Sequence, residues 1–242
     1  MYSQKFVKRE NKIDHQVYLC YTLKSRLSGR FCEVNFMKRE EKKQKMRRKI
    51  IDSALAEFSG QGYGVSSINT ICAAENISKG IVYHYFETKD DLYLACVEEC
   101  FQQLTDYIRS NFLKEDCSIE KHLRNYFSLR THFFQEHPVY QRIFCEAVIA
   151  PPAHLKAEIQ RRKQDFDLLN TQILRQLLSP VPLRSDISVE QIIEIFRQFQ
   201  DFINVRFQMT DLNPHTFEVR EENCMRALNV LLYGVIQRKD GC

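Results

Sequence analysis

Apolar residues recur along most of the chain at the three- and four-residue spacing that gives an α-helix one buried face. The first stripe predicts a helix over residues 41–59. Its members are Ile50, Ile51, Ala54, Leu55 and Phe58. Later stripes predict helices over residues 88–113, 118–136, 138–149, 154–178, 188–209 and 216–238. Thr88 is the predicted N-cap of the first of these, and Ser188 with Gln191 three residues later is a capping-box pattern at the start of helix 188–209. Because only 7 Gly and 6 Pro interrupt 242 residues, the pattern predicts an all-α protein.

Two shorter helices are predicted between the first helix and residue 88. Ser66 suits the N-cap of the first of them, because its hydroxyl can accept an otherwise orphan backbone N–H. Ile68, Ile71 and Cys72 then share one apolar face. Asn76 follows, and asparagine tolerates the left-handed conformation that a tight turn needs. The segment therefore predicts a helix over residues 67–75 and then a turn.

The second short helix is predicted over residues 79–86. Ser78 can cap it, and Val82 and Phe86 lie four residues apart and point inward. The polar side chains of this helix are therefore predicted to lie on its exposed faces. Two short helices around a three- to four-residue turn, with donors displayed on the second, indicate a helix-turn-helix. The second helix of such a motif enters the DNA major groove.

The charge is distributed unevenly along the chain. Residues 1–49 carry 15 Lys and Arg against 5 Asp and Glu, a balance of +10, whereas the whole chain has a net charge of +4. The positive end therefore adjoins the helix-turn-helix, where it can meet DNA phosphates. It ends in a basic run, Lys42, Lys43, Lys45, Arg47, Arg48 and Lys49. This run is interpreted either as a solvated helix face or as a phosphate-binding surface.

Residues 1–40 are predicted to be a basic N-terminal extension. Their apolar residues show no sustained periodicity. Met37 stands just ahead of the first helix, so residues 1–36 are either a disordered arm or a stretch upstream of the physiological initiator. The sequence contains neither a secretory signal nor a membrane-spanning run. The 9 cysteines are therefore expected to be reduced thiols in a cytoplasmic protein.

Residues 45–95 contain a series of short motifs. They are Gly62-Tyr63, Ser66-Ser67-Ile68, Ile71, Ile77-Ser78-Lys79-Gly80, Val82-Tyr83-His84-Tyr85-Phe86 and Lys89-Asp90-Asp91-Leu92. In order and spacing they resemble the TetR family (TetR/AcrR, tetracycline-repressor-like) of transcriptional regulators. Cys72 and Glu75 depart from the family's usual alanine, and Asn76 departs from its usual glycine. Beyond residue 95 the resemblance is one of architecture.

The resemblance implies an N-terminal three-helix helix-turn-helix DNA-binding domain, residues 41–90, and a C-terminal helical ligand-binding and dimerisation bundle, residues 91–242. It also implies a homodimer whose recognition helices read a pseudo-palindromic operator in double-stranded DNA. A small-molecule effector would shift the spacing of these helices, with helix 88–113 as the lever. Repression is the usual activity of the family, and activation stays open. The last two helices are apolar on more than one face, so we expect them to form the dimer interface.

The predicted DNA contacts lie on and around the second short helix. Lys79 can reach guanine O6 and N7 or a phosphate, and Ile81 can touch a thymine methyl group. Lys89, at the start of the next helix, is expected to bind a phosphate. As the resemblance implies, Gly80 lets the backbone approach the DNA. The predicted set is Ser67, Asn69, Ser78, Lys79, Gly80, Ile81, Tyr83, His84, Tyr85 and Lys89. For Tyr83, His84 and Tyr85 the alternative is packing between domains.

Aromatic residues are concentrated in the C-terminal part of the chain. Each ring by itself is typical of core packing, but together they favour a helical bundle with an apolar cavity for a hydrophobic or aromatic ligand. The predicted pocket consists of Tyr126, Arg130, Phe133, Phe134, Phe144, Phe166 and Phe199.

The sequence contains no GxSxG, HExxH, phosphate-binding glycine loop or CxxC motif. We therefore expect no catalytic residues, no cofactor and no metal. Cys96 and Cys100, four residues apart on one helix, are either packing residues or a thiol or metal sensor. The favoured function is a repressor that a small, largely hydrophobic or aromatic ligand releases from DNA. The alternatives are a TetR-like protein that acts through protein partners without operator binding, and a helical enzyme.

Overall fold

The computed structural model describes residues 39–112, 118–208, 226, 227 and 230. For residues 200, 201 and 203–208 it describes the backbone only. The chain divides into two compact units, Met1–Lys49 and Ile50–Cys242. In the first unit residues 39–49 are helical, and the basic side chains of the run are exposed. The predicted extension up to residue 38, and the predicted last helix apart from residues 226, 227 and 230, lie outside the described residues.

In the part of the chain that the structure describes, the secondary-structure elements are helices, which confirms the all-α class. The first helix spans residues 39–61. It ends at Gly62, whose N–H donates to the Phe58 carbonyl at 2.8 Å. The φ of Gly62 is 78°, a left-handed conformation that glycine adopts without the clash of a Cβ.

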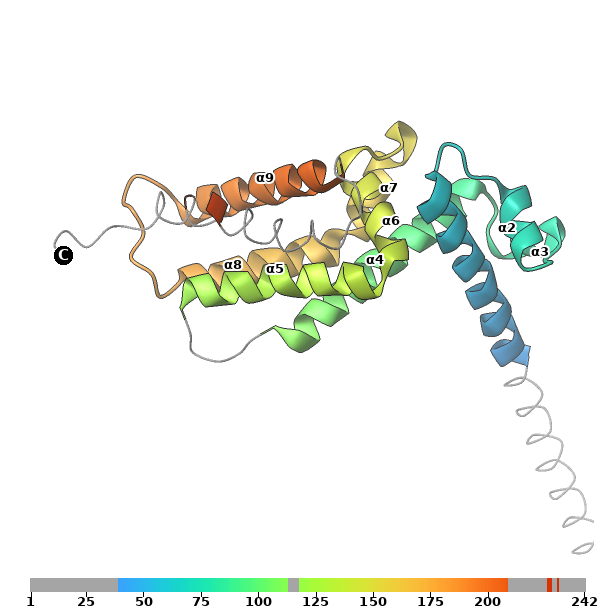
Figure 1. The fold of residues 1–242 in the computed structure, drawn as a ribbon, viewed down its shortest axis with the longest axis horizontal. Coiled ribbons are helices and arrows are strands. Elements are labelled where there is room, and N and C mark those ends of the chain that lie inside the picture. The colour runs from blue at the N-terminus through green and yellow to red at the C-terminus, as the bar shows by residue number, and fades with distance from the viewer. Residues whose placement is uncertain (1–38, 113–117, 209–225, 228–229, 231–242) are drawn as a thin grey trace, which may run out of the picture. The chain divides into compact units, whose positions relative to one another are not determined.

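The helix-turn-helix consists of α2 (Ile68–Ala74) and α3 (Lys79–Tyr85), each within one residue of its predicted bounds (Figure 1). Their facing side chains are buried as predicted: Ile68, Ile71, Cys72, Val82 and Phe86. Asn76 lies in the turn with a φ of 55° and is the one non-glycine residue with a positive φ among those described. Its predicted left-handed conformation is therefore confirmed.

The N-cap of α2 is Ser67, so the prediction of Ser66 was wrong. The Ser67 hydroxyl accepts the Asn69 N–H at 3.1 Å. Ser66 is buried instead, and its hydroxyl donates to the backbone carbonyl of Gly62. The sequence pattern alone does not distinguish two adjacent serines as N-caps. Ser66 is excluded because its hydroxyl bonds to Gly62, at the end of the preceding helix.

Helix α4 (Lys89–Asn111) begins with the predicted cap at Thr88. Thr88 Oγ1 accepts the Asp91 N–H at 3.0 Å, and the Asp91 carboxylate accepts the Thr88 N–H at 3.0 Å, a reciprocal capping box. Along its length α4 contacts α5 (Ile119–Glu136), α6 (Pro138–Ile149), α7 (Lys156–Arg162) and α8 (Gln164–Leu178). It is therefore the helix around which the bundle packs.

The remaining helices complete the bundle. Helix α9 (Val189–Gln208) begins with the predicted capping box, in which the Gln191 N–H donates to Ser188 Oγ at 3.2 Å and the Ser188 N–H donates to Gln191 Oε1 at 2.8 Å. Helix α8 lies beside α5 and also contacts α9 (Figure 1). Helices α6 and α7 lie at the end of the bundle where α4 begins (Figure 1).

The single helix predicted over residues 154–178 is wrong. The chain instead forms a 3-10 turn, η1 (Ala153–Leu155), then α7, and α8 starts after a break at Lys163, whose φ and ψ are −91° and 2°. The buried residues Ile159, Phe166 and Ile173 continue one stripe at seven-residue spacing across this break. A one-residue bend leaves hydrophobic periodicity in phase, so the pattern alone contains no sign of it.

Asn76 provides a test of the turn. We expect Asn76→Ala to lower the free energy of unfolding by about 1 kcal/mol, because alanine bears the steric cost of a left-handed backbone. Asn76→Gly should change it by less than about 0.5 kcal/mol, since glycine adopts this conformation freely but loses more chain entropy on folding. Urea unfolding at a fixed protein concentration measures both. Equal losses for the two variants would contradict the backbone explanation.

Candidate nucleic-acid interface and effector site

Helix α3 buries one face and exposes the other. Val82 is 1% exposed, whereas its neighbours Ile81 and Tyr83 are 39% and 48% exposed. The other exposed residues of the predicted set on this helix are Lys79, Gly80 and His84. A branched aliphatic side chain and a phenol at the surface contribute little to the core. They are available to another molecule that approaches this face.

Gly80 lies in the first turn of α3 and leaves an open surface. A Cβ placed on it would have no atom within 4 Å. Its place inside an α-helix also requires no glycine, and glycine in a helix is less stable than alanine by about 0.5–1 kcal/mol. The packing of the protein therefore does not explain the missing side chain. Glycine at this position leaves room for another molecule to approach the backbone closely.

Two predicted contacts also cap helices. Besides Ser67 on α2, Ser78 accepts the Ile81 N–H at 3.4 Å and caps α3. A serine hydroxyl that accepts a backbone N–H retains its own O–H as a donor. Asn69, in the first turn of α2, is exposed. All three side chains can therefore donate to a phosphate without loss of the helix caps.

Lys89 and Tyr85 are held by neighbouring rings. The Lys89 ammonium lies 4.5 Å from the centre of the Tyr63 ring, a cation–π contact at the start of α4. Tyr85 is half-buried, and its ring meets that of His84 edge-on at 5.4 Å between centroids. These contacts position the two side chains on the protein, and the Lys89 ammonium keeps donors for a phosphate.

Tyr63 connects three segments. Its hydroxyl donates to Asp90 Oδ1 on α4 and lies 3.3 Å from Nε2 of His154 on η1. The same Nε2 lies 3.1 Å from Asp90 Oδ2. Burial and the hydrogen bond to the Asp90 carboxylate together raise the pKa of Tyr63 to about 12. The phenol is therefore a neutral donor near neutral pH.

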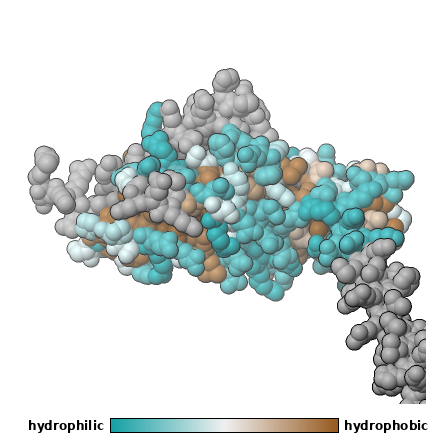
Figure 2. Space-filling view, turned by 90° about the horizontal axis from the view of Figure 1, so that it is seen from below, coloured by the Kyte–Doolittle hydropathy of each residue, from teal (hydrophilic) through white to brown (hydrophobic). Residues whose placement is uncertain are grey.

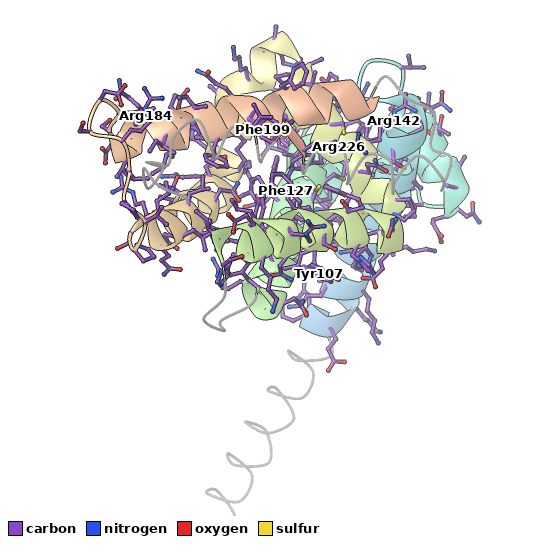
Figure 3. All side chains as sticks on the ribbon, turned by 60° about the vertical axis from the view of Figure 1, so that its left-hand side comes forward. Tyr107, Phe127, Arg142, Arg184, Phe199 and Arg226 are labelled. Carbon is purple, nitrogen blue, oxygen red and sulfur yellow. The ribbon has the colours of Figure 1, made fainter. Side chains whose placement is uncertain are left out.

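Helix α6 holds the segment that precedes the helix-turn-helix. The backbone N–H of Tyr63 donates to both carboxylate oxygens of Glu146, at 3.0 and 3.2 Å, and the Tyr93 hydroxyl donates to Oε2 at 3.3 Å. One turn earlier on α6, Arg142 donates to the Gly60 carbonyl at 2.9 Å (Figure 3). We call these five residues the α6 junction. The sequence did not predict it, because no local signal pairs residues that lie 53 to 83 positions apart.

Arg130 is buried in the bundle, with an exposed fraction of 7%. Its guanidinium carbon lies 5.7, 5.5 and 5.7 Å from the ring centres of Tyr126, Phe144 and Phe166. Three of its companions in the predicted pocket thus surround it. The rings come from α5, α6 and α8, so this cluster joins three helices.

The other predicted pocket residues pack against neighbouring rings. Phe133 contacts the rings of Tyr107 and Tyr140, and Phe134 contacts that of Phe144. Phe199 meets Phe127 edge-on at 6.4 Å, between α9 and α5 (Figure 3). The structure therefore brings Tyr126, Arg130, Phe144 and Phe166 together and leaves Phe133, Phe134 and Phe199 at the edges.

A small internal cavity lies between α5, α8 and α9. About 10 Å³ of it is accessible to the centre of a water molecule, enough for about one water. Tyr126 borders it and donates its hydroxyl to Asn170 Oδ1 at 2.6 Å. Asn170 and Phe127, which also line this cavity, were absent from the predicted pocket. An asparagine in the apolar stripe of α8 was the available signal for Asn170.

The four cysteines that the structure describes, Cys72, Cys96, Cys100 and Cys145, are buried free thiols. Cys96 and Cys100 are both fully buried, and Cys100 donates to the Tyr140 carbonyl at 3.4 Å. Burial raises the pKa of the Cys100 thiol, and the nearby Cys145 thiol raises it further. A thiol with a raised pKa forms little reactive thiolate. Among the described residues no group of three or more His, Cys, Asp or Glu is placed to hold a metal ion.

Apolar side chains also reach the surface of the bundle. On the face drawn in Figure 2, hydrophobic areas lie between hydrophilic ones. Phe202 of α9 is 58% exposed and Leu168 of α8 is 50% exposed. Elsewhere on α9, Ile192 and Phe196 are buried. Within the described ranges, no helix is both long enough and apolar enough to cross a membrane.

Comparison with known proteins agrees with this architecture. The family model "Bacterial regulatory proteins, tetR family" matches residues 50–96, and the model "Tetracyclin repressor-like, C-terminal domain" matches residues 117–238, half of the chain. The regulator IcaR of Staphylococcus epidermidis, a "Biofilm operon icaADBC HTH-type negative transcriptional regulator", is 29% identical over 122 residues, 50% of this chain and 63% of that protein. IcaR of Staphylococcus aureus strain Newman is 36% identical over 75 residues, 31% of this chain and 40% of that protein. The chain thus matches less than two thirds of the length of these relatives.

A solved structure confirms the fold. The transcriptional regulator FadR from Bacillus subtilis, in complex with stearoyl-CoA, aligns with a TM-score of 0.61 at 16% identity and covers 75% of this chain and 97% of its own. The two family models follow one another in the order of the two predicted parts, with the helix-turn-helix in the first. The chain belongs to the TetR family of bacterial transcriptional regulators.

Proposed function

We propose that the protein is a repressor that binds a pseudo-palindromic DNA operator as a homodimer and is released by a small, largely hydrophobic or aromatic ligand. The observation that carries the DNA-binding part is the open surface of α3 at Gly80, beside exposed Lys79, Ile81 and Tyr83. Because Gly80 has no side chain and faces open space, the backbone of α3 can approach a base edge or a phosphate closely. The protein would act in the cytoplasm, where the DNA is.

The relatives support repression and a ligand of this kind. Both IcaR proteins are named negative transcriptional regulators, and the FadR structure is a complex with stearoyl-CoA, which has a long apolar chain. The relatives are regulators rather than enzymes, so we propose no catalytic activity. The proposed dimer interface includes α9, whose Phe202 is exposed and available to a partner.

The α6 junction supports coupling between ligand and DNA. A ligand releases DNA only if it binds the DNA-incompetent arrangement of the dimer more tightly than the competent one. Glu146 and Arg142 fix the segment before the helix-turn-helix to α6, in addition to the covalent path through α4. A change in the position of α6 would therefore be transmitted to α2 and α3.

The alternative function uses the same surface for a protein partner and involves no operator. Binding of the purified protein to DNA from its own promoter region, measured at several salt concentrations, separates the two. The repressor proposal requires sequence-dependent binding that weakens steeply with salt, as phosphate contacts demand. Binding that is absent or independent of sequence would favour the protein-partner function.

Gly80→Ala gives the sharpest test of the recognition helix. The variant should be as stable as the natural protein or more stable, because alanine is a better helix former by about 0.5–1 kcal/mol. Its operator affinity should nevertheless fall by about tenfold or more, since a methyl group would separate the helix from the DNA. Fluorescence anisotropy with labelled promoter DNA measures the affinity, and thermal unfolding measures the stability. Gly64→Ala is the matched control, because a Cβ at Gly64 also meets nothing within 4 Å but lies outside α3.

Lys79 and Lys89 should differ in the kind of contact they make. Lys79→Gln should cost about 1–3 kcal/mol of specific binding and relax discrimination between operator variants, as loss of a base contact does. Lys89→Gln should weaken binding to all sequences and reduce the salt slope by about one phosphate contact for each protomer. Titrations at several salt concentrations measure both effects. Lys121→Gln, an exposed lysine on α5, is the control, and an equal effect there would refute both assignments.

Glu146→Gln should loosen the α6 junction. We expect operator affinity to change by about two- to thirtyfold, the range of 0.5–2 kcal/mol found for coupling residues. The difference in affinity between operators of different half-site spacing should become smaller, because the recognition helices would be held less firmly. Binding to operators with inserted or deleted central base pairs measures this preference. The control is Glu158→Gln, which removes an exposed ion pair with Arg161 on α7, and the same flattening there would contradict the assignment.

A further inference from the structure

We infer that Glu57 limits the affinity of the protein for DNA, because its carboxylate lies beside the phosphate that Ser67 would bind. This inference rests on the proposed DNA binding. It goes beyond that proposal, since it assigns an affinity-determining residue outside the predicted contacts, with an effect opposite in sign to theirs. The same carboxylate also positions the first turn of α2, and the experiment below separates the two roles.

Glu57 connects the first helix to the start of α2. Its Oε1 accepts the Ser67 N–H at 3.1 Å, and its backbone carbonyl accepts the Ser66 hydroxyl at 3.3 Å. Ser67 in turn caps α2, because its hydroxyl accepts the Asn69 N–H. A hydrogen bond to an ionised acceptor is stronger than one between neutral groups. The partly buried Glu57 side chain is therefore held next to Ser67 and exposed Asn69, two of the predicted phosphate contacts.

The charge of Glu57 is not balanced by a neighbouring cation. In the ranges that the structure describes, no Lys, Arg or His forms an ion pair with this carboxylate, and its hydrogen bond comes from a neutral backbone amide. The positive end of the α2 dipole stabilises a carboxylate at this place, but it amounts to a partial charge only. A phosphate that approaches Ser67 therefore meets a net negative charge.

The distances place this charge within range of a DNA phosphate. The N and Oγ atoms of Ser67 belong to one residue, and a phosphate oxygen that accepts from the hydroxyl lies about 2.7 Å from it. Carboxylate and phosphate would then be separated by less than about 10 Å, the Debye length at about 0.1 M salt. Two like charges about 8 Å apart in water lower an affinity about twofold. A homodimer would carry this effect twice.

Such repulsion would have a use in a regulator that has to leave its operator. The effector shifts the equilibrium only by the difference between its affinities for the two arrangements of the dimer. An operator complex that Glu57 weakens is released by a correspondingly smaller difference. The lysines predicted to contact DNA, Lys79 and Lys89, act in the opposite direction.

The test replaces the carboxylate by its neutral isostere. Glu57→Gln keeps an oxygen that can accept the Ser67 N–H and removes only the charge. We expect the variant to bind promoter DNA and random-sequence DNA about three- to thirtyfold more tightly than the natural protein at about 50 mM salt. The gain should shrink as the salt concentration rises, because screening weakens the repulsion. Fluorescence anisotropy with labelled DNA measures the affinities. A purely structural role of Glu57 requires unchanged or weaker binding, and that result would overturn the inference.

A second variant keeps the test decisive if Glu57→Gln does not fold. Glu57→Met removes both the charge and the acceptor but retains a side chain of similar length. Its melting temperature should fall, because the Ser67 N–H loses its partner. Its affinity for DNA should nevertheless rise, so stability and affinity would change in opposite directions. A loss of both would overturn the inference.

Two comparisons locate the effect. Glu136→Gln removes an exposed carboxylate from the last turn of α5 and changes the net charge by the same amount. An equal gain in affinity there would overturn the assignment to Glu57. Ser67→Gly removes the hydroxyl that would hold the phosphate, and glycine is tolerated at an N-cap. In this background the gain from Glu57→Gln should fall to about twofold or less, since the two residues act on one phosphate. An undiminished gain would overturn the assignment.

The outcomes distinguish this inference from the proposed function. Specific promoter binding by the natural protein that Glu57→Gln does not strengthen would overturn the inference and leave the function standing. A gain on DNA of every sequence, without any preference for the promoter, would support the charge effect and refute operator recognition. No binding by either protein would refute both. A gain that keeps the preference for the promoter supports both.

Discussion

The connection between the bundle and the segment that leads into the helix-turn-helix depends on the carboxylate of Glu146. It accepts the Tyr63 amide with both oxygens and the Tyr93 hydroxyl with one, at 3.0–3.3 Å. Hydrogen bonds to an ionised acceptor are about twice as strong as neutral ones. Tyr93 is fully buried, and burial together with the Glu146 charge keeps its pKa above the usual range, so the phenol stays a donor. The segment after the first helix is thereby held on α6.

The local elements could be predicted because their causes lie within a few residues. The cap pairs at Thr88 and Ser188, and the turn at Asn76, follow from side chains next to the backbone groups they serve. The periodicity of α3 separated buried Val82 from its exposed neighbours for the same reason. The break at Lys163 escaped prediction, because a bend of one residue does not disturb the apolar stripe. The choice of Ser67 over Ser66 depended on the end of another helix.

Features of the site that depend on residues close together in the sequence could be predicted. Contacts between residues far apart in the sequence could not. The exposed face of α3 is a property of one short helix, so its residues could be named, although their contact with DNA stays a prediction. The α6 junction joins residues more than 50 positions apart, and no local pattern marks Glu146 as the acceptor. The aromatic residues of the bundle were visible in the sequence. Their close packing around Arg130 was not, because it depends on how three helices meet.

Helix α6 has different partners on opposite sides. Glu146 contacts Tyr63, whereas Phe144, two residues earlier and therefore about half a turn around the helix, packs against Phe101 and Phe166. A packed helix moves as a unit because interiors transmit displacement rather than absorb it. A displacement of Phe144 would therefore shift the Glu146 carboxylate as well. Since a hydrogen bond is lost beyond about 3.5 Å, a shift on the order of 1 Å is enough to weaken the α6 junction.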